Sequence, residues 1–562
     1  MRCRQIDRAP ARGETHGNAA RFHVASKGNR AAGTFQGLRA SRLNSPVRMN
    51  GIERGAQPLY MVTATDDSPA RRGGARALGA LVLLALSGCL SNPPGVRGVA
   101  GTAPAPNVRW TPPRERASRD TTAAVPAPAL PADLAQRIQA LTLADIVDLA
   151  LRKNTATAAA WADARAAAAT YGAARGQYYP TLTADLNATA VKTAATAGRV
   201  SVQQQLYGPT LNASWLLFDF GTRSGSVGGA REALLAADWT HNAVIQDVVL
   251  QVESAYFQYH ATKALLAAQQ TTLKEAQTNL EAAEQRHRVG LATIADVLQA
   301  RTARSQVQLA LETAEGTLQT ARGALALSMG LPANVPYDVE LPPDTTPPLG
   351  ITDSLDALID RAVRERPDLM AARATAQAAQ SRVAVARGQA LPSLVVSGTG
   401  SGTYFFRRPL ANQQGNSYSA TIGLQIPLFS GWSQIYDVRA ASAAARAADE
   451  RRQGVEQQVI FQVFNSFYAA RTATQRVRTS DDLLASATQS EQVALGRYRA
   501  GAGSLLDLLT AQAVLADARA QVIDARLAWY SALAQLGHDA GILGLDGQSG
   551  LHVQTDSTGP NR

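Results

Sequence analysis

Cysteine is almost absent from this chain, since only Cys3 and Cys89 occur among its 562 residues. A later start of translation would remove Cys3, so no intrachain disulfide is expected. The seven histidines are scattered, and no two stand at metal-ligand spacing. The sequence also lacks a Walker phosphate loop, a Gly-x-Ser-x-Gly motif and a cysteine–histidine arrangement. We therefore expect no metal site, no cofactor and no enzyme.

Basic charge is scarce outside the beginning of the chain. The whole sequence carries a net charge of +11, but residues 1–80 hold fourteen Lys and Arg against five Asp and Glu, which leaves +2 for the remainder. The charge therefore gives no reason to expect nucleic acid as a partner. Apolar residues make up 46% and charged residues 18%, which is ordinary content for a folded chain.

Residues 61–88 have the pattern of a secretory signal. An arginine-rich head precedes an apolar run over 77–86, which is too short to span a bilayer as a helix. The run ends in Leu-Ser-Gly directly before Cys89. We interpret residues 1–60 as an over-extended start, because a normal signal could begin at Met61. A chance cysteine after an ordinary secretory signal is the alternative interpretation of Cys89.

From residue 141 onward the chain repeats itself. The sequence YPTL at 179–182 returns as LPSL at 391–394, an offset of 212, and DVL at 296–298 returns as DLL at 507–509, an offset of 211. One register over so long a stretch indicates the duplication of one large element. We expect a Pro-rich tether over 89–140, repeat 1 over 141–341, repeat 2 over 342–541 and a loose tail over 542–562.

Each repeat predicts the order helix, strand, strand, long helix, helix. Residues 230–289 contain neither Gly nor Pro, so we expect a helix over 222–289, roughly 100 Å long at about 1.5 Å per residue. Its counterpart is expected over 432–500. The shorter segments 143–176 and 293–329 together nearly equal the long helix in length, so that stacked end to end they would match it.

Four segments show the alternation of apolar and polar residues that is typical of strands. We expect these strands over 181–191, 209–218, 393–406 and 418–429. Strands of this length and pattern cross a bilayer when they are tilted, but a half-buried soluble hairpin has the same alternation. If the strands do cross a membrane, several chains must share one barrel, because an open sheet edge cannot face lipid.

The chain resembles the TolC family of outer-membrane efflux proteins. The resemblance rests on the duplicated layout and on four motifs, which are LFDFG at 217–221, PLFSG at 427–431, RYRAG at 497–501 and SLLDLL at 504–509. It covers about residues 141–541. The Leu-Ser-Gly-Cys pattern at Cys89 resembles a bacterial lipobox, which implies that this cysteine carries lipid and that the chain belongs to the lipid-anchored, NodT-like branch.

The resemblance implies a mainly α fold with membrane β-strands. Three identical chains would share a 12-stranded outer-membrane barrel, four strands from each, and a long periplasmic α-helical barrel. The function implied is a passive exit duct for small molecules. Its partners would be a periplasmic adaptor of the membrane fusion type, an inner-membrane transporter of RND type and outer-membrane lipid.

The resemblance also implies roles for single residues. The periplasmic aperture would contain Asp507 and Thr510 with their repeat mates Asp296 and Gln299, although many relatives carry a second Asp where Thr510 stands. A helix-capping role with Ser504 is the competing interpretation of Asp507. Helix tips that meet the adaptor would include Arg288, Gly290, Arg497, Arg499, Gly501 and Gly503, of which the arginines could also be solvated helix ends. Aromatic side chains at the membrane interface would be Trp215, Tyr404, Phe405 and Phe406, for which packing within a sheet is the alternative.

Three other functions remain open at this point. A type I exit channel for secreted polypeptides would keep the same architecture with another client. An envelope structural lipoprotein built on coiled coils would have no barrel. A periplasmic adaptor would also have long helical hairpins, but the β domain that usually accompanies them is not evident in the sequence.

Overall fold

The computed structural model describes residues 101–111, 141–194, 201–339, 350–351, 353–408, 413–543 and 553–554. The chain divides into two units, Met1–Ser87 and Gly88–Arg562, and all described residues belong to the second. The expected over-extended start over 1–60, the expected signal over 61–88 and Cys89 lie outside the described residues.

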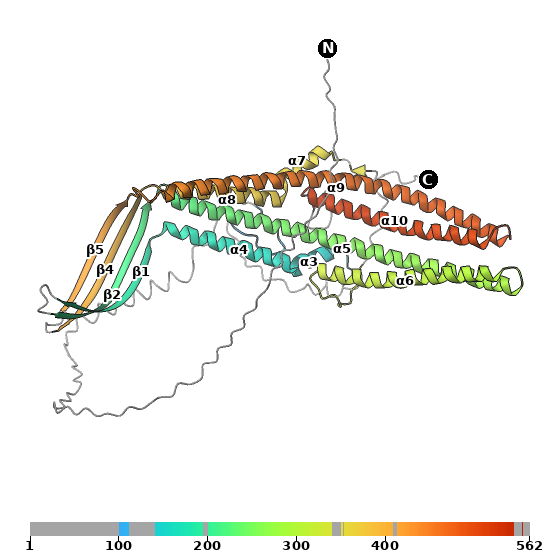
Figure 1. Ribbon diagram of the computed structural model, residues 1–562, viewed down its shortest axis with the longest axis horizontal. Coiled ribbons are helices and arrows are strands. Elements are labelled where there is room, and N and C mark those ends of the chain that lie inside the picture. Colours follow the sequence, from blue (N-terminus) through green and yellow to red (C-terminus); the bar gives the residue numbers. More distant parts are fainter. Residues whose placement is uncertain are drawn as a thin grey trace, which may run out of the picture. The chain divides into compact units, whose positions relative to one another are not determined.

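Two repeats of the same element order make up the described body, which confirms the predicted duplication (Figure 1). The first repeat contains α3 (Leu143–Lys153), α4 (Thr155–Arg175), a 3-10 turn (Gly176–Tyr178), β1 (Thr181–Ala194), β2 (Ser201–Phe218), α5 (Thr222–Arg288) and α6 (Ile294–Ser328). The second contains α7 (Leu355–Glu365), α8 (Pro367–Gly388), β4 (Ser393–Arg408), β5 (Gln413–Gln425), α9 (Ser433–Arg499) and α10 (Leu505–Asp539). The short strands β3 (Gly350–Ile351) and β6 (Val553–Gln554) pair with each other.

The long helices match their predicted spans to within about two residues. Helices α5 and α9 have 67 residues each, and α6 and α10 have 35 each. Each long helix ends just before a glycine in the left-handed region, Gly290 at φ 75° and Gly501 at φ 73°, where a residue with a Cβ would be strained. The chain therefore turns sharply at these points, and the return helix packs along the long one.

None of the described helices has a stretch long and apolar enough to cross a membrane.

The sequence predicts one helix over 143–176, but the structure has two helices there. Helix α3 ends and α4 begins at Asn154, whose backbone is extended (φ −66°, ψ 130°) and whose side chain accepts a hydrogen bond from the Ala156 N–H. An asparagine suits this place because it caps the new helix. The second repeat breaks at the matching position, Arg366, since the following Pro367 favours an extended conformation in the residue before it.

The four longer strands form one antiparallel sheet in the order β1-β2-β4-β5. All four predicted strands are present, but β2 begins at Ser201 rather than 209, and β5 spans Gln413–Gln425 rather than 418–429. The alternation of apolar and polar residues did not reveal the beginning of β2, because Gln203, Gln204 and Gln205 show no change of polarity. Their backbones nevertheless continue the ladder with β1 and β4.

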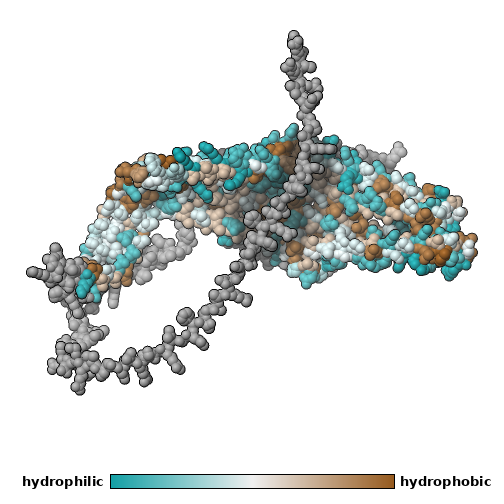
Figure 2. Space-filling view, in the orientation of Figure 1, coloured by the Kyte–Doolittle hydropathy of each residue, from teal (hydrophilic) through white to brown (hydrophobic). Residues whose placement is uncertain are grey.

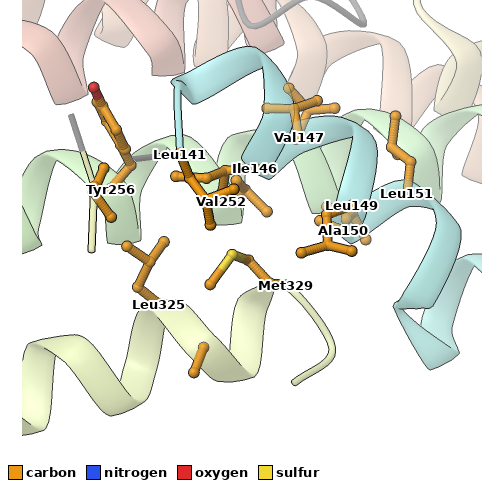
Figure 3. Packing of buried hydrophobic residues seen from close by; sticks show 14 of the residues in the cluster. Leu141, Ile146, Val147, Leu149, Ala150, Leu151, Val252, Tyr256, Leu325 and Met329 are labelled. Carbon is orange, nitrogen blue, oxygen red and sulfur yellow. The ribbon is translucent and has the colours of Figure 1, made fainter. Parts of the chain in front are cut away.

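Each repeat has a hydrophobic core at the break in its first helix. In repeat 1, α3 lies against α5 and α6, and Ile146, Val252, Leu325 and Met329 meet there (Figure 3). Repeat 2 has a corresponding cluster, in which α7 contributes Leu358 and α10 contributes Leu536. These two clusters hold the short helices on the long ones.

Residues 101–111 pack on the helices, although the sequence predicts a tether there. The backbone of Trp110 donates to Asn242 Oδ1 and accepts from Asn242 Nδ2, both at 2.7 Å, and its ring lies edge-on to Trp239. The Trp161 indole donates to the Ala103 carbonyl. The alanine- and proline-rich composition hid these contacts, because a single tryptophan, Trp110, makes three of them. The predicted tail also has ordered parts, since Leu543 is fully buried and Val553–Gln554 forms β6.

Candidate functional site

The four-stranded sheet has one apolar and one polar face. Because partners in an antiparallel ladder share a face, the register places on one side, across all four strands, the residues Leu182, Ala184, Leu186, Leu211, Ala213, Trp215, Val396, Ile422 and Leu424. On the other side lie Thr183, Asp185, Asn187, Thr210, Asn212, Ser397, Thr399, Ser401, Ser419 and Thr421. The alternation seen in each strand therefore adds up to one amphipathic wall.

The apolar face has no extensive partner in the described part of the chain. The four strands make many contacts with one another, but none with a helix at a comparable level. Leu186 is 82% exposed, Ile422 is 74% exposed and Leu182 is 67% exposed. A half-buried soluble hairpin would cover such residues with a helix or a second sheet. Nothing in the described part of the chain covers this face, and exposed apolar patches of this kind mark interaction surfaces.

Aromatic side chains mark both ends of the apolar face. Tyr207 stacks on Tyr404 and on Phe406, with ring centroids 5.2 and 5.3 Å apart. Trp215 lies eight residues further along β2, about 26 Å at roughly 3.3 Å per residue, and its indole donates to the Tyr178 carbonyl at 3.1 Å. Further apolar side chains gather where the strands pass into the helices, as Figure 2 shows near the start of α9.

The expected aromatic set is therefore divided between two faces. Trp215, Tyr404 and Phe406 lie on the apolar face, but Phe405 points to the polar face, because successive residues of a strand alternate. Tyr207, which the sequence analysis did not select, takes its place. The strand register would have identified it, because Tyr207 is paired directly with Tyr404.

The turns that close the helical hairpins carry matching caps. Asp507 accepts from the Ser504 N–H at 3.3 Å, while the Asp507 N–H donates to Ser504 Oγ at 3.1 Å. Thr293 and Asp296 make the same reciprocal pair at the start of α6. Both expected aperture carboxylates thus cap helices in the single chain. Hydrogen bonds from Ser504, with help from the charge of Arg497, hold the pKa of Asp507 below its ordinary value.

A shallow groove of about 400 Å³ between α9 and α10 brings together four of the predicted residues. Arg497, Gly503, Asp507 and Thr510 line it, with Val493 and Val514 among its apolar walls. Gln299 and Asp296 lie on the other hairpin and do not line it. The groove therefore combines a cation, a carboxylate and an apolar floor at the end of one hairpin.

The two hairpin ends are joined by contacts that the sequence analysis missed. The Arg286 guanidinium lies 4.5 Å from the centre of the Tyr498 ring and donates to the Tyr498 carbonyl at 3.3 Å. Val297, Leu505 and Leu508 pack beneath this pair. Arg288 and Arg499, by contrast, are exposed at the helix ends. No signal in the sequence brings residues 286 and 498 together, because only the packing of one repeat on the other does so.

Nearer the middle of the long helices, His538 joins the two repeats. Its Nε2 lies 2.8 Å from Asp247 Oδ1 on α5, and its Nδ1 lies 3.1 Å from Asp539 Oδ1. Burial alone lowers the pKa of His538, but the two carboxylates outweigh it and raise that pKa to about 9. The imidazolium therefore donates to both carboxylates at neutral pH.

This junction predicts a loss of stability in alkali. A folded-state pKa of about 9, above the unfolded value of 6.5, means that the contribution is complete below about pH 6.5 and is lost as the pH rises through 9. It amounts to at most about 3 kcal/mol. Thermal melting followed by circular dichroism from pH 7 to 10 should show the loss, and His538→Gln should remove most of it. His287→Gln, at the exposed hairpin end, should keep the wild-type dependence; an equal flattening in both variants would contradict the assignment.

No group of three His, Cys, Asp or Glu side chains among the described residues could hold a metal ion. The buried carboxyls of Asp238 and Glu253 on α5 have pKa values raised to about 7 by burial. Neither residue lines the groove at the end of the α9–α10 hairpin. The groove therefore contains neither of these two carboxyls with a raised pKa.

Known proteins are similar to this chain over both of its repeats. A family model described as "Outer membrane efflux protein" matches residues 146–331 and 358–541. Protein CyaE of Bordetella pertussis is 30% identical over 488 residues, which cover 83% of this chain and 96% of the relative. The pyoverdine export outer membrane protein OpmQ of Pseudomonas putida is 29% identical over 321 residues, 55% of this chain and 65% of the relative.

Solved structures share the fold. The outer-membrane channel OprN superposes with a TM-score of 0.66 at 21% identity, covering 72% of this chain and 90% of that one. The outer membrane protein VceC of Vibrio cholerae gives 0.63 at 21% identity, with 71% and 96% covered. An amphipathic sheet that continues into long helical hairpins is thus the architecture of an outer-membrane channel. The chain belongs to the outer membrane efflux protein family.

Proposed function

We propose that three copies of this chain form one continuous tunnel through the outer membrane and into the periplasm. The observation that carries the proposal is the uncovered apolar face of the four-stranded sheet. Four strands are too few to close a barrel, and the smallest membrane barrels have about eight. Three copies would supply twelve, with the apolar face toward lipid and the polar face toward the lumen.

The tunnel would be a passive exit duct for small molecules. Relatives are named for exporting pyoverdine, toluene and cations, which share little chemistry, so a duct that does not select its cargo fits them. Energy and selection would come from an RND-type transporter in the inner membrane. A periplasmic adaptor would dock at the groove between α9 and α10, where Arg497 and Asp507 flank apolar walls.

The beginning of the chain would attach it to the membrane. The thiol of Cys89 would carry lipid and cleavage before it would make it the first residue, and the absence of Asp at the next residue, Leu90, favours the outer membrane. In the same proposal residues 61–88 would be the signal and residues 89–140 the anchor with its tether. Residues 101–111 would belong to that tether. The bonds of Trp110 to Asn242 would hold this part of the tether against α5.

The aperture proposal can be separated from the capping role of the same carboxylate. Three copies of Asp507 in a narrow pore would attract cations, and its lowered pKa keeps it charged at neutral pH. In planar bilayers, Asp507→Asn should reduce cation selectivity several-fold. Ser504→Ala removes the cap, at about 1 kcal/mol, but keeps the charge, so its selectivity should stay close to wild type.

The same preparation tests the function as a whole. Purified protein with the native mass of a trimer and a low-conductance pore is the expected result. A monomer or a coiled-coil dimer that does not insert would contradict the tunnel and favour a structural lipoprotein. If the protein forms a trimeric pore but deletion of its gene blocks polypeptide secretion rather than drug export, the transported client would be a secreted protein and not a small molecule. Equal selectivity in Asp507→Asn and wild type would leave Asp507 as a cap only.

A further inference from the structure

One carboxyl has opposite surroundings in the two repeats. Helices α5 and α9 match at an offset of 211 residues, so Asp238 on α5 corresponds to Asp449 on α9. The Asp449 side chain is half exposed and satisfied, because Arg452 Nε donates to one oxygen at 2.8 Å and Gln453 Nε2 donates to the other at 3.0 Å. Asp238 is fully buried instead, and neither of its oxygens has a hydrogen-bond partner among the described residues.

The side chains that could satisfy Asp238 are present on α5. His241 and Asn242 stand at the positions of Arg452 and Gln453. They follow Asp238 by three and four residues, so all three side chains lie on one face of the helix. Both could donate to the carboxyl as their counterparts do on α9, but neither bonds it.

Residues 101–111, which we call the strap, hold both of these donors. His241 Nε2 donates to the Pro106 carbonyl at 2.9 Å. Asn242 exchanges two hydrogen bonds of 2.7 Å with the backbone of Trp110. The strap therefore covers the face of α5 that carries the unpartnered carboxyl, and occupies the groups that would bond it.

The site for the strap is built in repeat 1 only. Trp239 and Trp161 both contact the strap, one through its ring and the other through its indole N–H. Their counterparts in repeat 2, at offsets of 211 and 212, are the charged residues Glu450 and Arg373. Repeat 2 thus shows how the same helix face is arranged when no strap site is present.

Docking of the strap leaves polar atoms buried without partners. Arg109 Nη2 donates to the Leu543 carbonyl at 2.7 Å, which joins the strap to the end of repeat 2. Arg109 Nε, His241 Nδ1 and both oxygens of Asp238 have no hydrogen-bond partner among the described residues. Each such atom opposes docking, because it has given up water and received nothing in return. The contacts of the strap are therefore partly offset by the groups it buries.

We propose that the strap is a releasable element, and that on its release His241 and Asn242 donate to Asp238. The docked and released states then differ by an exchange of partners around one carboxyl. Asp449 shows the released arrangement in the other repeat. The exchange also breaks the bond between the strap and the end of repeat 2. This inference concerns the single chain and does not depend on the proposed trimer.

The exchange also changes where protons are held. In the docked state, burial raises the pKa of Asp238 from 3.8 to about 7 and lowers the pKa of His241 below 6.5. The contribution of Asp238 to docking is therefore complete at low pH and is lost as the pH rises through 7. The contribution of His241 is complete above pH 6.5 and is lost as the pH falls. The two effects oppose each other in the wild type and separate when either residue is replaced.

Charged groups nearby do not account for the pKa of Asp238, because burial is its only cause. The charged side chains at this end of the elements packed on α5 are Arg109 of the strap, Asp163 and Arg165 of α4, and Arg366, Asp368 and Arg373 of α8.

The rate at which Ala103→Cys reacts with a maleimide measures release in the full-length protein. Ala103 is 4% exposed and Val108 is 38% exposed, so Val108→Cys gives the reference rate within the same strap at each pH. Peptide mass spectrometry separates these sites from Cys3 and Cys89. We expect slow but complete reaction at residue 103, and Trp110→Ala should raise its rate to that of residue 108.

Asp238→Asn should slow the reaction at residue 103 about tenfold at pH 8, because it removes the buried charge that opposes docking. Asp449→Asn makes the same change at the matching position of repeat 2 and should leave the rate as in the wild type. His241→Gln keeps a donor for the strap but carries no charge, so its rate should rise as the pH is raised from 5 to 8. The rate in Asp238→Asn should instead rise as the pH is lowered.

Four results would each overturn the proposal. They are an equal rate in Asp238→Asn and wild type, an equal slowing in Asp449→Asn, pH slopes of the same sign in Asp238→Asn and His241→Gln, and no reaction at residue 103 in the wild type over days. Reaction at residue 103 as fast as at residue 108 in every variant would show that the strap does not dock, and would overturn it as well. None of these results bears on the channel, which native mass and conductance test separately.

Discussion

Replacing Leu211 with arginine should keep the channel out of the outer membrane. Leu211 lies near the middle of the apolar face, between the aromatic rows at Tyr207 and Trp215, and is 49% exposed. An arginine on the lipid face of a barrel at the bilayer midplane costs about 2–4 kcal/mol, and a trimer would carry three. We expect the amount of trimer in outer-membrane fractions to fall at least tenfold.

Thr210→Arg is the matched control for this prediction. Thr210 is the preceding residue on β2 and lies on the polar face, opposite Asp185 on β1. An arginine there would meet water and a carboxylate, so insertion should continue and only conductance and selectivity should change. If both variants inserted equally well, the apolar face would not be the lipid face. If Thr210→Arg alone failed, the two faces would be assigned the wrong way round.

A second large effect is expected in the core of repeat 1. Leu325 on α6 is fully buried among Ile146, Val252 and Met329 (Figure 3). Leu325→Ala should lower the free energy of unfolding by about 2–5 kcal/mol, because the neighbouring helices can close only part of the cavity. Thermal melting of the helical circular dichroism signal in detergent would measure the change.

Leu327→Ala makes the same chemical change two residues away. Leu327 is 69% exposed in the single chain, so the alanine should leave the melting of the monomer within about 0.5 kcal/mol of wild type. A large loss of monomer stability in Leu327→Ala would mean that this side chain is covered within its own chain.

The sequence predicted those parts of the fold that depend on local pattern. The Gly- and Pro-free run over 230–289 indicated the long helix, and the left-handed glycines Gly290 and Gly501 end the two long helices close to the predicted residues. The break at Asn154 was missed because its Ala-rich surroundings are compatible with one continuous helix. The Arg366-Pro367 step at the same place in the second repeat could have revealed it.

Candidate site residues were predictable only as far as they depend on neighbours in the chain. Ser504 with Asp507 is a local capping pair, and the structure forms it. Phe405 was grouped with Tyr404 and Phe406 because the three are consecutive, whereas alternation along a strand places it on the opposite face. The Arg286–Tyr498 contact joins residues that are 212 positions apart.

The sequence by itself determined the duplication, the helices with their caps and the amphipathic strands, because each of these follows from residue type and spacing over a few turns. Only the tertiary structure decided the sheet order β1-β2-β4-β5, the shared apolar face and the His538 junction between repeats. Those features depend on which segments meet across two hundred residues. Which segments meet is decided by the burial and pairing of the whole folded chain. No short stretch of sequence contains that information.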